Sequence, residues 1–179
     1  MSGHNKWSKI KHKKAAGDAK KSQTFSKLAR LITSESKKAH GDVTLPGLAT
    51  AIAKAKTANM PADNIDRAVK KGAGGEADSM EAILYEAYGP GGVALMIEAL
   101  TDNRNKAAQE VKHILSKNGC ALAAPGSAAW AFEKTADGWE PKSTTDLVDT
   151  DAEKLASLVD ELEENDEVQA VFTNAQTHS

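Results

Sequence analysis

The glycine-rich segment Gly72-Ala73-Gly74-Gly75 constrains the fold most, because apolar residues recur at helical spacing before it and in strand-like runs after it. Glycines allow positive φ and a change of chain direction, so the segment predicts a linker between two domains, residues 1–75 and 76–179. Charge changes at the same place. Residues 1–75 contain 16 basic and 5 acidic residues and residues 76–179 contain 7 and 20, although the net charge is only −2. This asymmetry suggests a nucleic-acid-facing or membrane-facing end and a separate body.

Before the linker, three amphipathic patterns predict an all-helical domain. The first runs from Gly17 to Ala39, the second starts near Pro46, and the third starts at Pro61, where the missing N–H of proline is harmless. Their outward positions are rich in lysine, as in Lys54 and Lys56. The first domain is therefore expected to be a basic three-helix domain.

After the linker, the patterns predict an α/β domain. Strands are expected at residues 82–88, 93–100, 128–133 and 168–173, with a weaker one at 144–148. Helical spacing over residues 107–115 and 155–162 predicts two helices, the second starting from a capping box at Thr150. From Val93 onward this order is that of a ferredoxin-like domain, with residues 82–88 as an extra strand and helices on one face. The expected fold class is thus α+β.

Composition limits the class of protein. Hydrophobic residues make up 40% and charged residues 27%, as in globular chains. No apolar stretch approaches the roughly 20 residues that span a bilayer, so we expect a soluble protein without a membrane partner. Cys120 is the only cysteine, which excludes internal disulfides and a cysteine zinc cluster. The basic N-terminus lacks the apolar core of a secretory signal, and we interpret it as part of the working protein.

The basic N-terminus is the strongest functional signal. Residues 1–17 contain five lysines with Trp7 and His12 among them, and Lys20 and Lys21 continue the cluster on the first predicted helix. Lysines bind phosphate backbones through counterion release, and a tryptophan can stack on an unpaired base. The alternative is a solvated arm that keeps the domain in solution, with Trp7 in the core. The predicted nucleic-acid contacts are Lys6, Trp7, Lys9, Lys11, His12, Lys13, Lys14, Lys20 and Lys21.

Two loop types offer weaker phosphate-binding signals. The loop Thr101 to Lys106 leads from a strand into a helix, where N–H groups and Arg104 could hold a phosphate. We favour a capping role for Asp102 or Asn103, and keep Arg104 as a further candidate contact. The glycines at 72–75 and 89–92 match neither a P-loop nor a dinucleotide fingerprint, so they are interpreted as hinge and turn.

Catalysis finds little support in the sequence. The five histidines are scattered, no cysteine pair completes a metal site, and Gly119 and Ala121 give Cys120 no neighbouring base. Ser127 lacks a nucleophile-elbow frame. We therefore expect no enzyme, no catalytic residue, no metal and no cofactor.

Several stretches together resemble the YebC/PmpR family over nearly the whole chain. They are the opening segment 2–16, Asn59-Met60-Pro61 with Asn64-Ile65, the segment 71–75, Tyr85-Glu86 with 88–94, and the segment 100–105. The resemblance implies an N-terminal helical domain followed by α/β structure, a cytoplasmic location, and a DNA-binding role in transcription regulation. It also implies a rival role, because relatives that include a mitochondrial translational activator are associated with the ribosome.

One departure from the family is visible in the sequence. Family members usually carry an inserted small α/β domain between the strand near Glu133 and the strand before the last helix, where this chain has only Lys134 to Ser143. The chain is therefore expected to be a short member without the third domain. Two targets stay open: duplex DNA, or ribosomal or transfer RNA in translation, with lysine abundance favouring RNA slightly. A protein-interaction role of the acidic domain is a third possibility, and the oligomeric state is left open.

Overall fold

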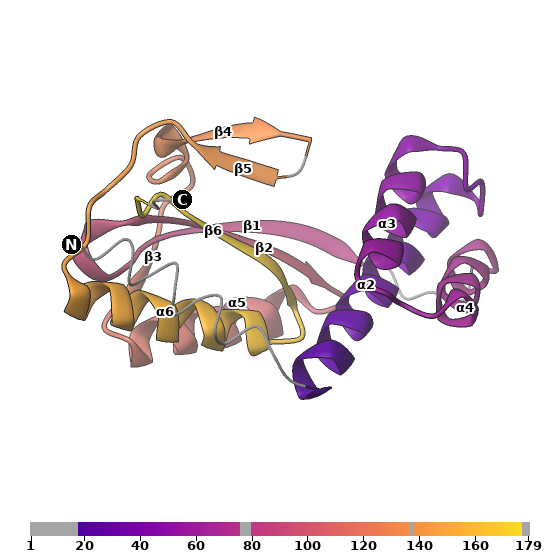
Figure 1. The fold of residues 1–179 in the computed structure, drawn as a ribbon, viewed down its shortest axis with the longest axis horizontal. Coiled ribbons are helices and arrows are strands. Elements are labelled where there is room, and N and C mark those ends of the chain that lie inside the picture. Colours follow the sequence, from indigo (N-terminus) through magenta and orange to yellow (C-terminus); the bar gives the residue numbers. More distant parts are fainter. Residues whose placement is uncertain (1–17, 76–79, 137, 177–179) are drawn as a thin grey trace. The chain divides into compact units, whose positions relative to one another are not determined.

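The computed structural model describes residues 18–75, 80–136 and 138–176, with side chains from Lys21 onward (Figure 1). Two compact units are present: one spans Gly17–Glu81, and the other contains residues 82–179. Helices form the first unit and a sheet with helices forms the second, which confirms the predicted α+β class.

Three helices make up the first unit, as the periodicity predicted. They are α2 (Asp18–Ala39), α3 (Pro46–Thr57) and α4 (Ala62–Ala73), with Pro46 in the first turn of α3 and Pro61 at the N-cap of α4. Both α3 and α4 pack mainly on α2 and contact each other little. The core of this unit is aliphatic, and its fully buried centre includes Ile32, Leu48 and Ala55.

The crossing of α2 and α4 depends on a glycine. A Cβ atom at Gly72 would lie 2.4 Å from the carbonyl oxygen of Thr33 and 2.6 Å from the Cβ of Ser36. Side chains of α2 also form hydrogen bonds with the backbone of α4. The Ser36 hydroxyl donates to the Val69 carbonyl at 2.6 Å. The Thr33 hydroxyl lies 3.3 Å from the Ala68 carbonyl. The C-terminal halves of the two helices therefore lie in close contact.

A four-stranded sheet forms the centre of the second unit. Its strands are β1 (Glu81–Tyr88), β2 (Ala94–Thr101), β3 (Ala121–Ala123) and β6 (Val168–Thr173), in the order β3-β1-β2-β6. A turn with the 3-10 segment η1 (Pro90–Gly92) joins β1 to β2. The strands β3 and β6 pair antiparallel with β1 and β2 respectively.

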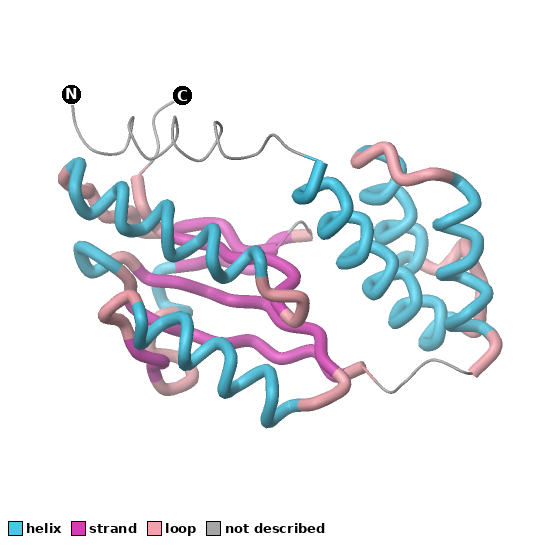
Figure 2. The backbone as a smooth tube through the Cα atoms, turned by 90° about the horizontal axis from the view of Figure 1, so that it is seen from below, coloured by secondary structure: helices cyan, strands magenta, loops and turns pink. Residues whose placement is uncertain are grey.

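The two faces of the sheet are covered differently. The helices α5 (Arg104–Lys117) and α6 (Asp149–Glu164) lie on one face, as predicted (Figures 1 and 2). On the other face lies a hairpin of β4 (Phe132–Thr135) and β5 (Gly138–Pro141), preceded by the 3-10 segment η2 (Ala129–Ala131). Side chains of β2 alternate between the faces: Leu95 and Ile97 join the helix-side core, and Ala94 and Met96 join the hairpin-side core.

Three details of the strand prediction are wrong. The expected sheet strand at 128–133 is η2 followed by β4, and β4 pairs with β5 outside the sheet. The edge of the sheet beside β1 is formed by β3, a three-residue strand that is too short to give a periodic pattern in the sequence. The strand 82–88, expected as an addition, is one of the two central strands. Residues 144–148 form only a single bridge, between Thr145 and Ala175.

Candidate nucleic-acid interface

The predicted basic cluster is described only in part. Lys6, Trp7, Lys9, Lys11, His12, Lys13 and Lys14 lie outside the described residues. Lys20 and Lys21 belong to the start of α2, and the Lys21 side chain is exposed. Arg104 is the exposed first residue of α5, in the other unit.

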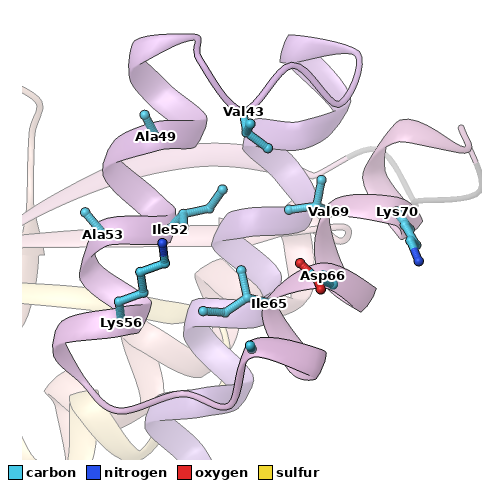
Figure 3. A pocket seen from close by; sticks show the side chains of 10 residues that line it. Val43, Ala49, Ile52, Ala53, Lys56, Ile65, Asp66, Val69 and Lys70 are labelled. Atoms are coloured by element: carbon cyan, nitrogen blue, oxygen red, sulfur yellow. The ribbon is translucent and has the colours of Figure 1, made fainter.

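A feature that the sequence patterns did not single out is a pair of lysines at the end of each helix of the first unit. The last turns contain Lys37 and Lys38 in α2, Lys54 and Lys56 in α3, and Lys70 and Lys71 in α4. All six side chains are exposed. Figure 3 shows Lys56 on α3 and Lys70 on α4 at opposite margins of the space between these helices.

Two of these lysine pairs are brought near each other by the α2–α4 crossing. Gly72 sits against the backbone of residues 33–37, so the α2 pair and the α4 pair lie at adjoining helix ends. The Lys38 ammonium is 2.9 Å from a Glu35 carboxylate oxygen. Cations at helix C-termini also interact favourably with the helix dipole, which gives the pairs a structural role independent of any ligand. The α2 and α4 pairs place four exposed lysines at adjoining helix ends, and lysine is a residue type that binds phosphate.

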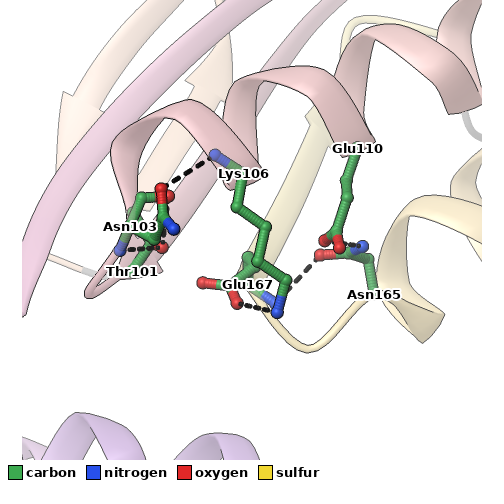
Figure 4. Close-up of polar contacts among 6 residues, drawn as sticks. All are labelled: Thr101, Asn103, Lys106, Glu110, Asn165 and Glu167. Carbon is green, nitrogen blue, oxygen red and sulfur yellow. Dashed lines mark hydrogen bonds and ion pairs between the residues drawn. The ribbon is translucent and has the colours of Figure 1, made fainter.

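The loop before α5 has the predicted capping geometry (Figure 4). The side-chain oxygen of Asn103 accepts a hydrogen bond from the Lys106 N–H at 3.0 Å, which makes Asn103 the N-cap. The hydroxyl of Thr101 accepts from the Asn103 N–H at 2.9 Å and fixes the turn. The Lys106 ammonium is 3.5 Å from the buried Glu167 carboxylate. Asn103, rather than Asp102, is thus the capping residue, and Arg104 projects from the first turn.

A buried carboxylate shapes a second surface loop. Glu86 on β1 accepts hydrogen bonds from three backbone N–H groups, those of Gly126, Ala128 and Ala129, at 2.6 to 2.9 Å. Burial raises the pKa of this carboxyl, but the three N–H groups lower it, and the pKa lies below its ordinary value. The loop presents Trp130, which is 57% exposed and donates its indole N–H to the Tyr88 hydroxyl at 2.9 Å.

The described residues give no support for a metal site or a reactive thiol. They contain no group of three or more histidine, cysteine or acidic side chains that could hold a metal ion. Burial raises the pKa of the Cys120 thiol, which favours its unreactive protonated form. None of the helices described is both long and apolar enough to cross a membrane.

Comparison with known proteins connects both units to one family. The model of the TACO1/YebC protein N-terminal domain matches residues 5–75. The model of the TACO1/YebC second and third domain matches residues 80–137 and 135–175. The two segments of the second match meet at the turn between β4 and β5.

Similar curated proteins carry the name "Probable transcriptional regulatory protein". One from Fervidobacterium nodosum is 41% identical over 235 positions, which cover 97% of this chain and 93% of that protein. Another, from Petrotoga mobilis, is 52% identical over 151 residues, covering 83% of this chain and 60% of the relative. The crystal structure of a conserved hypothetical protein from Aquifex aeolicus matches with a TM-score of 0.80 at 31% identity, covering 92% of this chain and 94% of that one.

The alignment lengths show that a relative contains residues that this chain does not have. The alignment with the Fervidobacterium protein has 235 positions, more than the 179 residues of this chain, so that relative contains residues with no counterpart here. The second family model is interrupted where the chain has only the β4–β5 hairpin, in agreement with the predicted gap at Lys134 to Ser143. With both family models matched in order along the chain, the protein belongs to the TACO1/YebC family.

Proposed function

We propose that this protein is a non-enzymatic regulator of gene expression that binds nucleic acid, with DNA-binding transcription regulation as its first function. The observation that carries the proposal is the lysine content of the helical unit, with a lysine pair at the end of each of its three helices. Residues 18–75 contain 11 basic and 5 acidic residues, and the five lysines of residues 1–17 add to this balance. The names of the relatives support a regulatory role at family level.

The kind of contact offered is phosphate binding. The exposed polar side chains of α3 are lysine and threonine, which hold a backbone but do not discriminate between bases as arginine and asparagine pairs do. We infer that the basic N-terminal arm contributes to the affinity together with the helix-end lysines. The proposed contacts of this arm and the start of α2 are Lys6, Trp7, Lys9, Lys11, His12, Lys13, Lys14, Lys20 and Lys21. Arg104 is a secondary contact. We also propose that the protein acts in the cytoplasm, where both candidate targets occur in bacteria.

The alternative is a ribosome-associated translation factor that binds ribosomal or transfer RNA. The lysine-rich surface favours it, because structured RNA is recognised largely by shape and backbone contacts. Such a factor would need no base-reading helix. Both functions make the same prediction about salt and differ in the nucleic acid recovered from cells.

The test of nucleic-acid binding is the salt dependence of affinity. Fluorescence anisotropy of the full chain with labelled duplex DNA and labelled single-stranded RNA of equal length would give log K against log[salt]. Replacing Lys11, Lys13 and Lys14 together by Ala should make the slope shallower by about two to three units, since each phosphate contact contributes about 0.7 to 0.9.

A matched control removes three exposed lysines of the other unit. Lys112→Ala, Lys142→Ala and Lys154→Ala together change the net charge equally and are expected to leave the slope nearly unchanged. Equal slopes for the arm variant and the unmodified protein would refute a role of the arm.

DNA and RNA as targets can be distinguished by an experiment in cells. Crosslinking the protein in cells and sequencing the attached nucleic acid is expected to recover promoter DNA. Recovery of ribosomal or transfer RNA without promoter DNA would instead establish the translation role.

A further inference from the structure

An apolar groove in the helical unit lies between α3 and α4. It exists because both helices pack on α2 and contact each other little. Its volume is about 580 Å³, and aliphatic side chains from both helices line it, among them Ile52, Ala53, Ile65 and Val69. Figure 3 shows Ile52, Ile65 and Val69 projecting into this space.

The apolar lining of the groove is continuous with the core of the unit, because Ile65 belongs to that core and Ile52 and Val69 pack against it. The helix α3 buries Leu48, Ala51 and Ala55 against the rest of the unit, yet it also directs Ile52 and Ala53 into the groove. Val43, which is 51% exposed, extends the apolar surface at one end. Ala53 and Val43 are exposed, so part of this apolar lining is accessible to a partner.

The charged residues at the margin of the groove indicate the charge of the partner that would bind there. Lys56 from α3 and Lys70 from α4 line the groove together with one acidic residue, Asp66. The helix α3 itself contains no acidic residue. Cations therefore outnumber anions at the margin, and an occupant with acidic flanks is electrostatically favoured.

The shape favours a helix over a nucleobase. Among the residues that the structure describes, no aromatic side chain lines the groove to stack on a base, and the Asp66 carboxylate would repel the attached phosphate. Aliphatic side chains along one face of an amphipathic helix are the usual occupants of an apolar groove between two helices. We propose that the α3–α4 groove is a docking site for an acidic amphipathic helix of a partner protein, separate from the phosphate-binding arm.

The probe is a defined acidic amphipathic peptide with the sequence of α6, DTDAEKLASLVDELEE. Labelled with fluorescein and added to the full-length protein, it should bind with a Kd on the order of 10 to 100 µM. The same peptide with every Asp and Glu replaced by Lys should bind at least about tenfold more weakly, because the two margin lysines then repel it.

Three variants test whether binding occurs in the groove. Ala53→Glu places a bulky anion at an exposed position that lines the groove and should weaken acidic-peptide binding by about tenfold or more. Thr50→Glu adds the same charge to α3 at an exposed position outside the groove lining, and should have little effect. Asp66→Asn removes the repelling carboxylate and should strengthen binding by roughly two- to threefold, a gain that unfolding cannot produce.

Several results would overturn the proposal. These are no peptide binding at about 1 mM, equal binding of the acidic and basic peptides, or equal effects of Ala53→Glu and Thr50→Glu. If Ala53→Glu weakens nucleic-acid binding while no peptide binds, the groove belongs to nucleic acid and the proposal is wrong. Nucleic-acid binding is tested separately by the salt dependence of the Lys11, Lys13 and Lys14 triple variant. Failure of the peptide experiment would therefore leave the proposed nucleic-acid function untouched, and the reverse also holds.

Discussion

Glu86 is the residue on which the loop after β3 depends. It is 7% exposed, and its two oxygens accept from the N–H groups of Gly126, Ala128 and Ala129. A buried carboxylate of this kind is stable only while its hydrogen bonds are made, because an ionised group without partners is costly to bury. These bonds help to explain why residues 128–131 form a 3-10 turn and not a sheet strand: the Ala128 and Ala129 N–H groups donate to Glu86, and the Ala131 N–H donates to the Ala128 carbonyl.

Replacing this carboxylate should destabilise the sheet unit. Glu86→Gln puts an amide donor against backbone donors and is expected to lower the free energy of unfolding by about 1 to 3 kcal/mol. Glu133→Gln, at an exposed position, is the matched control and should change it little. Urea unfolding followed by the fluorescence of Trp130 and Trp139 measures both.

The pH dependence of this difference checks its cause. The pKa of Glu86 in the folded protein lies below the ordinary value of 4.5, so its stabilising effect is complete above that value. The advantage of the unmodified protein over Glu86→Gln should shrink as the pH falls from 4.5 through the folded pKa. A difference that stays constant well below pH 4.5 would show that the charged form is not what the loop binds.

At the scale of elements, the α2–α4 contact holds the helical unit together. Gly72→Ala would place a methyl group 2.4 Å from the Thr33 carbonyl oxygen and 2.9 Å from the Lys37 nitrogen, both backbone atoms. The helices must separate, and we expect a loss of about 1 to 3 kcal/mol in the stability of this unit. Gly74→Ala is the control: the φ of Gly74 is −73°, and the added methyl group would lie 3.3 Å from the Lys70 carbonyl oxygen. Far-UV circular dichroism during urea unfolding measures the difference, and equal stability of the two variants would contradict the close crossing.

The elements also show what the sequence can and cannot predict. The helices α2, α3 and α4 repeat their apolar residues over several turns, so their local pattern was sufficient. The strand β3 has three residues and no pattern, and its position depends on pairing with Glu86 to Tyr88, far away in the sequence. Alternation of Trp130 and Phe132 mimics a strand, but only Phe132 begins one.

The candidate site was also predictable only in part from the sequence. The cap before α5 follows from residue types at a strand-to-helix junction, and the sequence predicted it apart from the choice between Asp102 and Asn103. Each lysine pair is visible in the sequence. Their proximity is not, because it results from a helix crossing that a single glycine permits. The groove likewise exists only because α3 and α4 share α2 as their support.

At the scale of the whole molecule, each unit has a core of its own. Every buried residue of the helical core falls between Ile32 and Ala68, and the two sheet-unit cores contain only residues from Ala87 onward. The sheet face opposite α5 and α6 is closed by the β4–β5 hairpin, through Phe132 and Trp139. The hairpin that covers the sheet also contains residues 135–137, where the two segments of the second family match overlap.

Separate cores predict separate unfolding. In a Trp7→Phe background, the remaining tryptophans, Trp130 and Trp139, both report on the sheet unit, whereas circular dichroism also reports on the three helices of the first unit. Gly72→Ala should lower the urea midpoint of part of the dichroism change by roughly 1 M and leave the fluorescence midpoint unchanged. Glu86→Gln should lower the fluorescence midpoint instead. If each substitution moved both signals together, the units would unfold as one cooperative body, and phosphate binding at the helices could then stabilise the sheet directly.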